Sequence, residues 1–247
     1  MKLKKLGMLT PSSNTVLEPI TCSLLHGVPG VSPHFSRFKV TEVSLSSTAA
    51  NQFSIEPMLQ AAHMLADAKV DVIAYNGTSG GWLGFDNDRR LCEQITKETG
   101  IPATTSVLAL NELFSVFQVS RYGLVSPCEQ AIVERIVKNY NGIGLHCASY
   151  ACSGISNNYE SGNVDEESIK EMVRSVALSG VNVITTFGTN LWSAQLAEEL
   201  EREFGILLLD TISAVVWKCL HMVGISPQSI SGWGKLFTAK EIHEVIE

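Results

Sequence analysis

Short apolar runs and helical stripes alternate along the chain. The segment 55–68 places apolar residues at a helical spacing, at Ile55, Met58, Leu59, Ala62 and Leu65. The apolar runs are only a few residues long, and each ends in small polar residues; they are Lys5–Leu9, Val70–Ala74, Gly123–Val125 and Val181–Thr185. Strand-like runs that alternate with helices are typical of an α/β fold, in which helices cover a parallel sheet.

The chain also resembles itself. The sequence GMLTPS at Gly7–Ser12 recurs as GLVSPC at Gly123–Cys128. Further along, VDVI followed by GTS at 77–79 recurs as VNVI followed by GTN at 188–190. Because the matches keep the same order, we expect two homologous α/β halves. The first half takes in residues 1–115, joined by C-terminal helices at 220–247, and the second takes in residues 116–219.

Composition and charge narrow the classes of partner. The 247 residues are 45% hydrophobic and 17% charged, which indicates a globular protein. The net charge is −7 and no basic run is longer than Lys4–Lys5, so we expect neither nucleic acid nor a membrane as a partner. No apolar run approaches the roughly 20 residues of a membrane span, and no signal-type segment follows Met1–Lys5. These features favour a cytoplasmic protein that binds a small molecule, and they leave a homo-oligomer open.

Neither the cysteines nor the histidines follow a metal-binding or disulfide pattern. The 6 cysteines include no C-x-x-C pair, and the 6 histidines form no H-x-H or H-E-x-x-H motif. We therefore expect reduced thiols and no metal site.

Small polar residues cluster where the predicted strands end. In an open parallel sheet, ligands bind at the carboxyl ends of the strands, where loops lead into helices. If the halves face each other across a pseudo-twofold axis, four segments converge on one cleft: Thr10–Asn14, Gly77–Gly80, Ser126–Cys128 and Gly188–Asn190. They supply hydroxyls, backbone N–H groups and helix N-termini but no lysine or arginine, which suits a carboxylate or an anion formed during reaction. The alternative is that these residues only cap helices.

Motifs in these segments carry a resemblance to a known family. GMLTPSSNTVLEP at the N-terminus, YNGTSGG at 75–81, GLVSP at 123–127 and FGTNLWSA at 187–194 resemble the aspartate/glutamate racemase superfamily, in the branch of arylmalonate decarboxylase and maleate cis-trans isomerase. The resemblance covers nearly the whole chain. It implies two Rossmann-like halves in pseudo-twofold symmetry with the cleft between them, and catalysis at the carbon α to a carboxylate without a metal or organic cofactor. It also implies a pocket of hydroxyls and backbone amides that holds one carboxylate.

The chain departs from this family at two positions. Racemases and maleate isomerases carry one cysteine in each half, at the positions of Gly77 and Gly188, and arylmalonate decarboxylase keeps only the second. Reactions that need either thiol are therefore disfavoured, and we expect the missing side chains to widen the cavity. Cys128 stands where the family usually has a tyrosine. It is either a proton donor, in which case its thiol should be partly exposed and reactive, or a small residue of the pocket wall.

The leading hypothesis is a cofactor-independent enzyme that acts on a small carboxylic or dicarboxylic acid through an enediolate-like intermediate. Loss of carbon dioxide fits best, because that step needs charge stabilisation rather than a base. The alternatives are a maleate-isomerase-like isomerase or water-using hydrolase of the same branch, and a carboxylate-binding protein without activity. The expected catalytic residues are Cys128, Thr78 and Ser79. The expected substrate-binding residues are Pro11, Ser12, Ser13, Asn14, Tyr75, Asn76, Gly77, Ser126, Gly188, Thr189 and Asn190.

Overall fold

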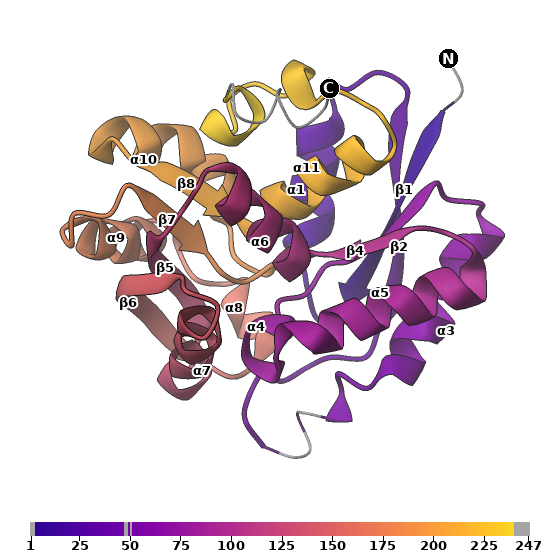
Figure 1. Cartoon of the computed structure of the whole chain (residues 1–247), viewed down its shortest axis with the longest axis horizontal. Coiled ribbons are helices and arrows are strands. Elements are labelled where there is room, and N and C mark those ends of the chain that lie inside the picture. The colour runs from indigo at the N-terminus through magenta and orange to yellow at the C-terminus, as the bar shows by residue number, and fades with distance from the viewer. Residues whose placement is uncertain (1–2, 47–48, 50, 240–247) are drawn as a thin grey trace.

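Each half of the chain contains one parallel sheet of four strands. The computed structural model describes residues 3–46, 49 and 51–239. The strand order is β2-β1-β3-β4 in the first sheet and β6-β5-β7-β8 in the second. The strands are β1 (Lys4–Pro11), β2 (Val31–Phe38), β3 (Val72–Tyr75), β4 (Ala103–Thr105), β5 (Arg121–Cys128), β6 (His146–Ile155), β7 (Val183–Thr186) and β8 (Leu207–Asp210). The matching order confirms the predicted α/β fold of two homologous halves (Figure 1).

Helices flank both sheets (Figure 1). The α-helices are α1 (Leu17–Leu25), α3 (Ile55–Asp67), α4 (Gly80–Leu83), α5 (Phe85–Thr99), α6 (Ser106–Val116), α7 (Gln130–Asn141), α8 (Asn158–Ser161), α9 (Glu166–Ala177), α10 (Ala197–Phe204) and α11 (Thr211–Met222), and a 3₁₀ turn, η1, covers Ala194–Leu196. The stripe predicted at 55–68 forms α3, in which Met58, Leu59, Ala62 and Leu65 are buried. None of the described helices is both long and apolar enough to cross a bilayer.

The internal repeat extends to the ends of the helices. The helix α5 ends at Gly100 with φ 71°, and α10 ends at Gly205 with φ 67°. Glycine suits this left-handed conformation because it has no Cβ. The strands that follow, β4 and β8, end at Thr105 and Asp210, whose side chains accept hydrogen bonds from backbone N–H groups of the next helix, α6 or α11. The two halves therefore share both the glycine that ends the helix and the capping residue that begins the next one.

One apolar core crosses from the first half to the second. The equivalent helices α6 and α11 pack against each other, and α11 also contacts α1 (Figure 1). The rings of Phe85 and Phe114, from the first half, lie 4.9 and 5.7 Å from the ring of Tyr140 in the second. Burial of large aromatic surfaces is strongly favourable, so this core holds the two sheets in one arrangement.

The C-terminal part departs in detail from the predicted helices at 220–247. The helix that contacts the first half, α11, begins at Thr211, well before residue 220. After it come two short 3₁₀ helices, Pro227–Ser229 and Lys235–Phe237, and the second of these packs against β8 and α10 of the second half. Residues 240–247 lie outside the described part of the chain. The division into domains at residues 115 and 219 stays a prediction.

Candidate active site

A narrow cavity lies between the two halves at the carboxyl ends of the strands. The volume that the centres of water molecules can occupy in it is about 30 Å³, which is enough for one or a few waters. Its lining comes from both halves: Pro11, Val40, Val43, Phe53, Tyr75, Gly77, Thr78, Trp82, Pro127, Cys128, Asn158, Ser161, Gly188, Thr189 and Asn190. No charged side chain is among these described residues. The cavity is therefore a neutral site between equivalent loops.

The structure divides the predicted site residues into two groups. Those that line the cavity are Pro11, Tyr75, Gly77, Thr78, Cys128, Gly188, Thr189 and Asn190. Those that do not are Ser12, Ser13, Asn14, Asn76, Ser79 and Ser126. Each residue of the second group hydrogen-bonds to a residue of the lining instead, and Ser12 itself is exposed on the surface.

Asn14 and Asn76 illustrate this supporting role. The Asn14 side-chain amide donates to the Thr189 carbonyl at 2.9 Å, and its oxygen accepts from the N–H groups of Val16 and Leu17. The Thr189 hydroxyl donates to the Asn76 carbonyl at 3.0 Å. These bonds join the loops of the two halves, so Asn14 and Asn76 position the wall rather than face the cavity.

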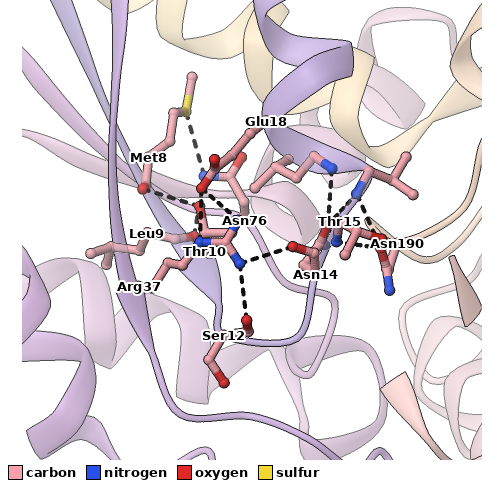
Figure 2. A network of polar contacts seen from close by, with 12 residues as sticks. Met8, Leu9, Thr10, Ser12, Asn14, Thr15, Glu18, Arg37, Asn76 and Asn190 are labelled. Atoms are coloured by element: carbon pink, nitrogen blue, oxygen red, sulfur yellow. Dashed lines mark hydrogen bonds and ion pairs between the residues drawn. The ribbon is translucent and has the colours of Figure 1, made fainter. Parts of the chain in front are cut away.

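The loop after β1 is held in the same way. Both Ser12 and Ser13 donate to the Val40 carbonyl, at 3.2 and 2.6 Å. The Arg37 guanidinium donates to the carbonyls of Ser12 and Asn14 (Figure 2). The Asn190 side-chain oxygen accepts from the N–H of Thr15 at 3.0 Å (Figure 2). The polar groups of this loop are therefore engaged within the protein.

Ser126 supports the neighbouring strand end. Its hydroxyl donates to the Phe187 carbonyl at 2.9 Å and accepts from the Cys128 N–H at 3.3 Å. Cys128 itself is buried, with 6% of its surface exposed, and burial raises the pKa of its thiol to about 11. The partly exposed, reactive thiol expected of a catalytic Cys128 is therefore not found. At neutral pH the residue presents a neutral S–H group, which can donate a proton but is a weak nucleophile.

Backbone N–H groups at the cavity wall are available to a ligand. Those of Gly77, Thr78, Thr189 and Asn190 donate to no acceptor among the residues that the structure describes. The Thr78 hydroxyl also has no partner there, whereas the Thr189 hydroxyl is already used. The two loops thus each present two free N–H groups from opposite halves, although only Thr78 and Thr189 are equivalent in the repeat, because the Gly188 N–H donates to the Thr211 hydroxyl. Such donors suit the oxygen atoms of a carboxylate.

Neither glycine that replaces a family cysteine opens the cavity. A Cβ atom on Gly77 would overlap the hydroxyl group of Tyr75, and a Cβ on Gly188 would lie 2.9 Å from the ring of Pro127. The expectation of a wider cavity was wrong, because other side chains fill the space. At Gly77, the space that a cysteine side chain would occupy is filled by the phenol of Tyr75, which also carries a proton.

Several lining residues were missed from the sequence: Val40, Val43, Phe53, Trp82, Asn158 and Ser161. Pro127 lies within the predicted segment Ser126–Cys128 but was not named as a site residue. Trp82 directly follows the motif at 75–81, so proximity in sequence was a usable signal for it. Val40, Val43 and Phe53 come from the chain between β2 and α3, and Asn158 and Ser161 from α8. They reach the cavity only through the tertiary fold.

The described residues contain no group of His, Cys, Asp or Glu side chains that would suit a metal ion. The donors at the cavity wall are neutral N–H, O–H and S–H groups. Such groups bind anions rather than cations. The chemistry of the described lining therefore suits an anion better than a cation.

Comparisons with known proteins agree with the fold. The family model of arylmalonate decarboxylase matches residues 19–237. Maleate isomerase of Nocardia farcinica is 26% identical over 245 residues, which cover 96% of each chain, and maleate isomerase of Pseudomonas putida is 24% identical over 96% of this chain and 98% of its own. Both of these curated relatives are maleate isomerases.

Solved structures show the same architecture. The Nocardia farcinica maleate cis-trans isomerase with a covalently bound succinylcysteine intermediate has a TM-score of 0.86 and 25% identity, over 95% of this chain and 98% of its own. Arylmalonate decarboxylase has a TM-score of 0.76 and 20% identity, over 95% of this chain and 99% of its own. The resemblance drawn from the motifs is confirmed: the chain belongs to the arylmalonate decarboxylase family and is an enzyme of the isomerase or lyase type.

Proposed function

We propose that this enzyme acts without a cofactor on a small dicarboxylic acid, at a carbon next to one of its carboxylates. The observation that carries the proposal is that each half places two unpaired N–H groups at the cavity wall, those of Gly77 and Thr78 in one half and those of Thr189 and Asn190 in the other. One pair binds each carboxylate. The N–H groups also stabilise negative charge that flows from the reacting carbon into a carboxylate, as an oxyanion hole does.

The substrate is small. Tyr75 and Pro127 fill the spaces beside the two glycines, and Phe53 and Trp82 narrow the cavity further. A four-carbon diacid demands less rearrangement of these side chains than an aryl-substituted malonate does. We therefore expect maleate and methylmalonate to compete better for the site than phenylmalonate.

Cis-trans isomerisation of a maleate-like acid is the reaction that the curated relatives favour. Rotation requires that the double bond become single for a time. Addition of a thiol to the double bond has this effect, and among the described residues that line the cavity Cys128 is the one that carries a thiol. Its S–H adds across the double bond: sulfur bonds to one carbon, the proton goes to the other, and elimination after rotation returns the thiol and the trans acid. The raised pKa of Cys128 makes this route slow compared with one that starts from a thiolate.

Decarboxylation is the second candidate, because the family model and the chemistry of the cavity both favour it. Burial raises the pKa of Tyr75 above its usual value and that of Cys128 to about 11. Both groups are therefore neutral acids at pH 7, and the described lining holds no strong base. Loss of carbon dioxide needs no base: the carbon–carbon bond breaks, its electron pair enters the enediolate, and a neutral acid then protonates the carbon.

The two reactions are separated by Cys128→Ser. Maleate is assayed for fumarate, and methylmalonate for propionate, by proton NMR. If the enzyme isomerises maleate through sulfur, the variant loses at least about 100-fold in rate and the wild type accumulates a maleate adduct on Cys128 that intact-protein mass spectrometry detects. If it decarboxylates, propionate forms from methylmalonate and no adduct forms on Cys128; the variant keeps most of this rate where a group other than Cys128 protonates the carbon.

The matched control is Cys152→Ser, a cysteine of β6 that lies outside the cavity lining. It should leave both rates unchanged. If diacids raise the melting temperature of the wild type but neither product forms, the site binds dicarboxylates without these reactions and the proposal of catalysis on them is wrong.

A further inference from the structure

A second cavity lies directly behind the first. It leaves about 60 Å³ for the centre of a water molecule, and its polar lining consists of Tyr75, Ser79, Asn87 and Asp88. Tyr75 and Phe53 line both cavities and thus separate them. A cavity of this size with several polar partners can hold water. Tyr75 therefore stands between the candidate active site and a small buried polar chamber.

Tyr75 is held firmly in this place. It is the last residue of β3, has 1% of its surface exposed, and packs edge-on against Phe38 at 5.8 Å between ring centroids. Its hydroxyl lies 2.9 Å from the Ser79 hydroxyl. The same Tyr75 hydroxyl fills the position where a side chain on Gly77 would begin. The chain thus offers a phenol to the face of the cavity next to the free N–H groups of Gly77 and Thr78.

Asp88 is the acid of the second cavity. It lies on α5, has 2% of its surface exposed, and accepts a hydrogen bond from the Thr105 hydroxyl. A side chain on Gly80 would overlap the Asp88 carboxyl group, so glycine at this position lets the acid lie against the loop that carries Ser79. No Lys, Arg or His among the described residues pairs with it. Such a buried acid without a counter-charge keeps its proton more readily than an exposed one.

We propose that Tyr75 is a further catalytic residue, which donates a proton to the reacting carbon on the Gly77 side, and that Ser79 and Asp88 are positioning residues that resupply this proton. The inference rests on the decarboxylation candidate of the proposed function, in which a neutral acid protonates the enediolate carbon. The Tyr75 O–H bond breaks as the enediolate electron pair forms the new C–H bond. The Tyr75 oxygen then takes the hydroxyl proton of Ser79, and Ser79 takes a proton that Asp88 gives up through water in the second cavity. Asp88 regains its proton from solvent before the next turnover, which supplies the one proton that each decarboxylation consumes.

The charge state of Asp88 gives the proposal a pH signature. The titratable groups near Asp88 are Tyr75 of β3, Cys92 of α5 and Tyr140 of α7, all of which are neutral at pH 7. Burial raises the pKa of Asp88 to about 7, against the opposing effect of the Thr105 hydrogen bond. The turnover number should therefore fall as pH rises through about 7, because the resupplying proton is lost.

The decisive variant is Tyr75→Phe, which keeps the ring and removes the proton. We expect the turnover number to fall by about 100-fold with little change in KM, as for loss of a general acid. The matched control is Tyr122→Phe, a buried tyrosine of β5 outside both cavities, which should leave turnover unchanged. Full turnover by a folded Tyr75→Phe protein would overturn the proposal.

Ser79→Ala and Asp88→Asn test the resupply. Both should lower turnover by about 10-fold, and Asp88→Asn should abolish the fall in turnover number near pH 7. A purely structural role predicts a lower melting temperature with an unchanged pH profile, and that result would overturn the roles of Ser79 and Asp88. If Tyr75→Phe does not fold, these two variants still decide the matter.

Failure of the proposed function is distinguishable from failure of this inference. A wild-type protein that neither binds succinate or malonate, measured by thermal shift, nor turns over maleate or methylmalonate refutes the proposed function. A wild-type protein that converts methylmalonate to propionate while Tyr75→Phe does so equally well refutes only the role of Tyr75. A wild-type protein that isomerises maleate but forms no propionate also overturns that role, because no enediolate then awaits a proton.

Discussion

The two loops that face each other across the cavity share a backbone but differ in what lies behind them. In the first half, β3 ends at Tyr75, whose hydroxyl fills the space next to Gly77. At the equivalent place in the repeat, β7 ends at Thr186, whose hydroxyl points away to Asp210. Both loops keep unpaired N–H groups at the cavity wall. The duplication has thus preserved the anion-binding backbone and let the supporting side chains diverge.

The buried acids behind the loops show the same contrast. Asp210 accepts hydrogen bonds from the hydroxyls of Thr186 and Ser193 and from the N–H groups of Ile212 and Ser213, where it begins α11. Asp88, by comparison, accepts one hydrogen bond from the described residues, that of Thr105. Burial raises the pKa of both carboxyl groups, but at Asp210 four hydrogen-bond donors oppose the rise, whereas at Asp88 only the Thr105 hydroxyl does. Asp210 is therefore suited to hold structure, and Asp88 to exchange a proton.

The largest expected effect is the pH dependence of stability due to Asp88. Its folded-state pKa of about 7 lies above the unfolded value of about 3.9, so its contribution is present below pH 4 and is lost as pH rises through about 7. At roughly 1.4 kcal/mol per pH unit, the total is on the order of 4 kcal/mol. Urea unfolding from pH 5 to pH 8 should show the wild type losing stability relative to Asp88→Asn. Parallel curves for the two proteins would mean that Asp88 is ionised in the fold.

Removal of Asp210 should be the most damaging change in the second half. Asp210→Ala leaves two buried hydroxyls and the first turn of α11 without their acceptor, so we expect a loss of about 3 kcal/mol in the free energy of unfolding. Asp88→Ala removes the acceptor of the Thr105 hydroxyl alone, so it should lower the free energy of unfolding by clearly less at pH 8. Equal losses in the free energy of unfolding at that pH would show that Asp210 and Asp88 stabilise the fold equally.

Restored side chains at the two glycines test what fills each space. Gly77→Cys should cost about 2 kcal/mol, because the buried Tyr75 phenol has to move, and the cost should shrink when combined with Tyr75→Ala. Gly188→Cys meets the edge of the Pro127 ring instead and should cost about 1 kcal/mol. Thermal melts measure both costs. If the costs of Gly77→Cys and Tyr75→Ala are additive, Tyr75 is not the obstacle.

The smallest expected effects separate the two threonines. Thr78→Val removes a hydroxyl with no partner in the described structure and should raise KM for a diacid by about 10-fold, because a binding group is lost. In Thr189→Val the lost hydroxyl donates to the Asn76 carbonyl, so we expect about 1 kcal/mol less stability and a KM within a factor of two or three of the wild type. A larger KM effect for Thr189→Val would mean that this hydroxyl turns to the substrate.

The sequence predicted where the site loops lie, but not which of their side chains face the cavity. The motifs at 77–80 and 188–190 were found because strand ends in a parallel sheet carry ligand-binding loops, and residues from both line the cavity. The same rule did not separate Thr78, whose hydroxyl is free, from Ser12, Ser13 or Asn14, whose polar atoms bond within the protein. Local sequence predicts that a polar group is near a site, but its hydrogen-bond partners come from distant segments.

The sequence by itself determined the alternating α/β pattern, the two homologous halves and the absence of charged side chains from the predicted loops. These follow from periodicity, from an internal repeat and from residue identity, all of which are local properties. Only the tertiary structure decided that Tyr75 occupies the space beside Gly77, that Pro127 lies beside Gly188, and that Asp88 stands behind Ser79. Such occupancy depends on how side chains from separate elements share a packed interior, and a missing side chain at one position is refilled by whichever neighbour can reach it.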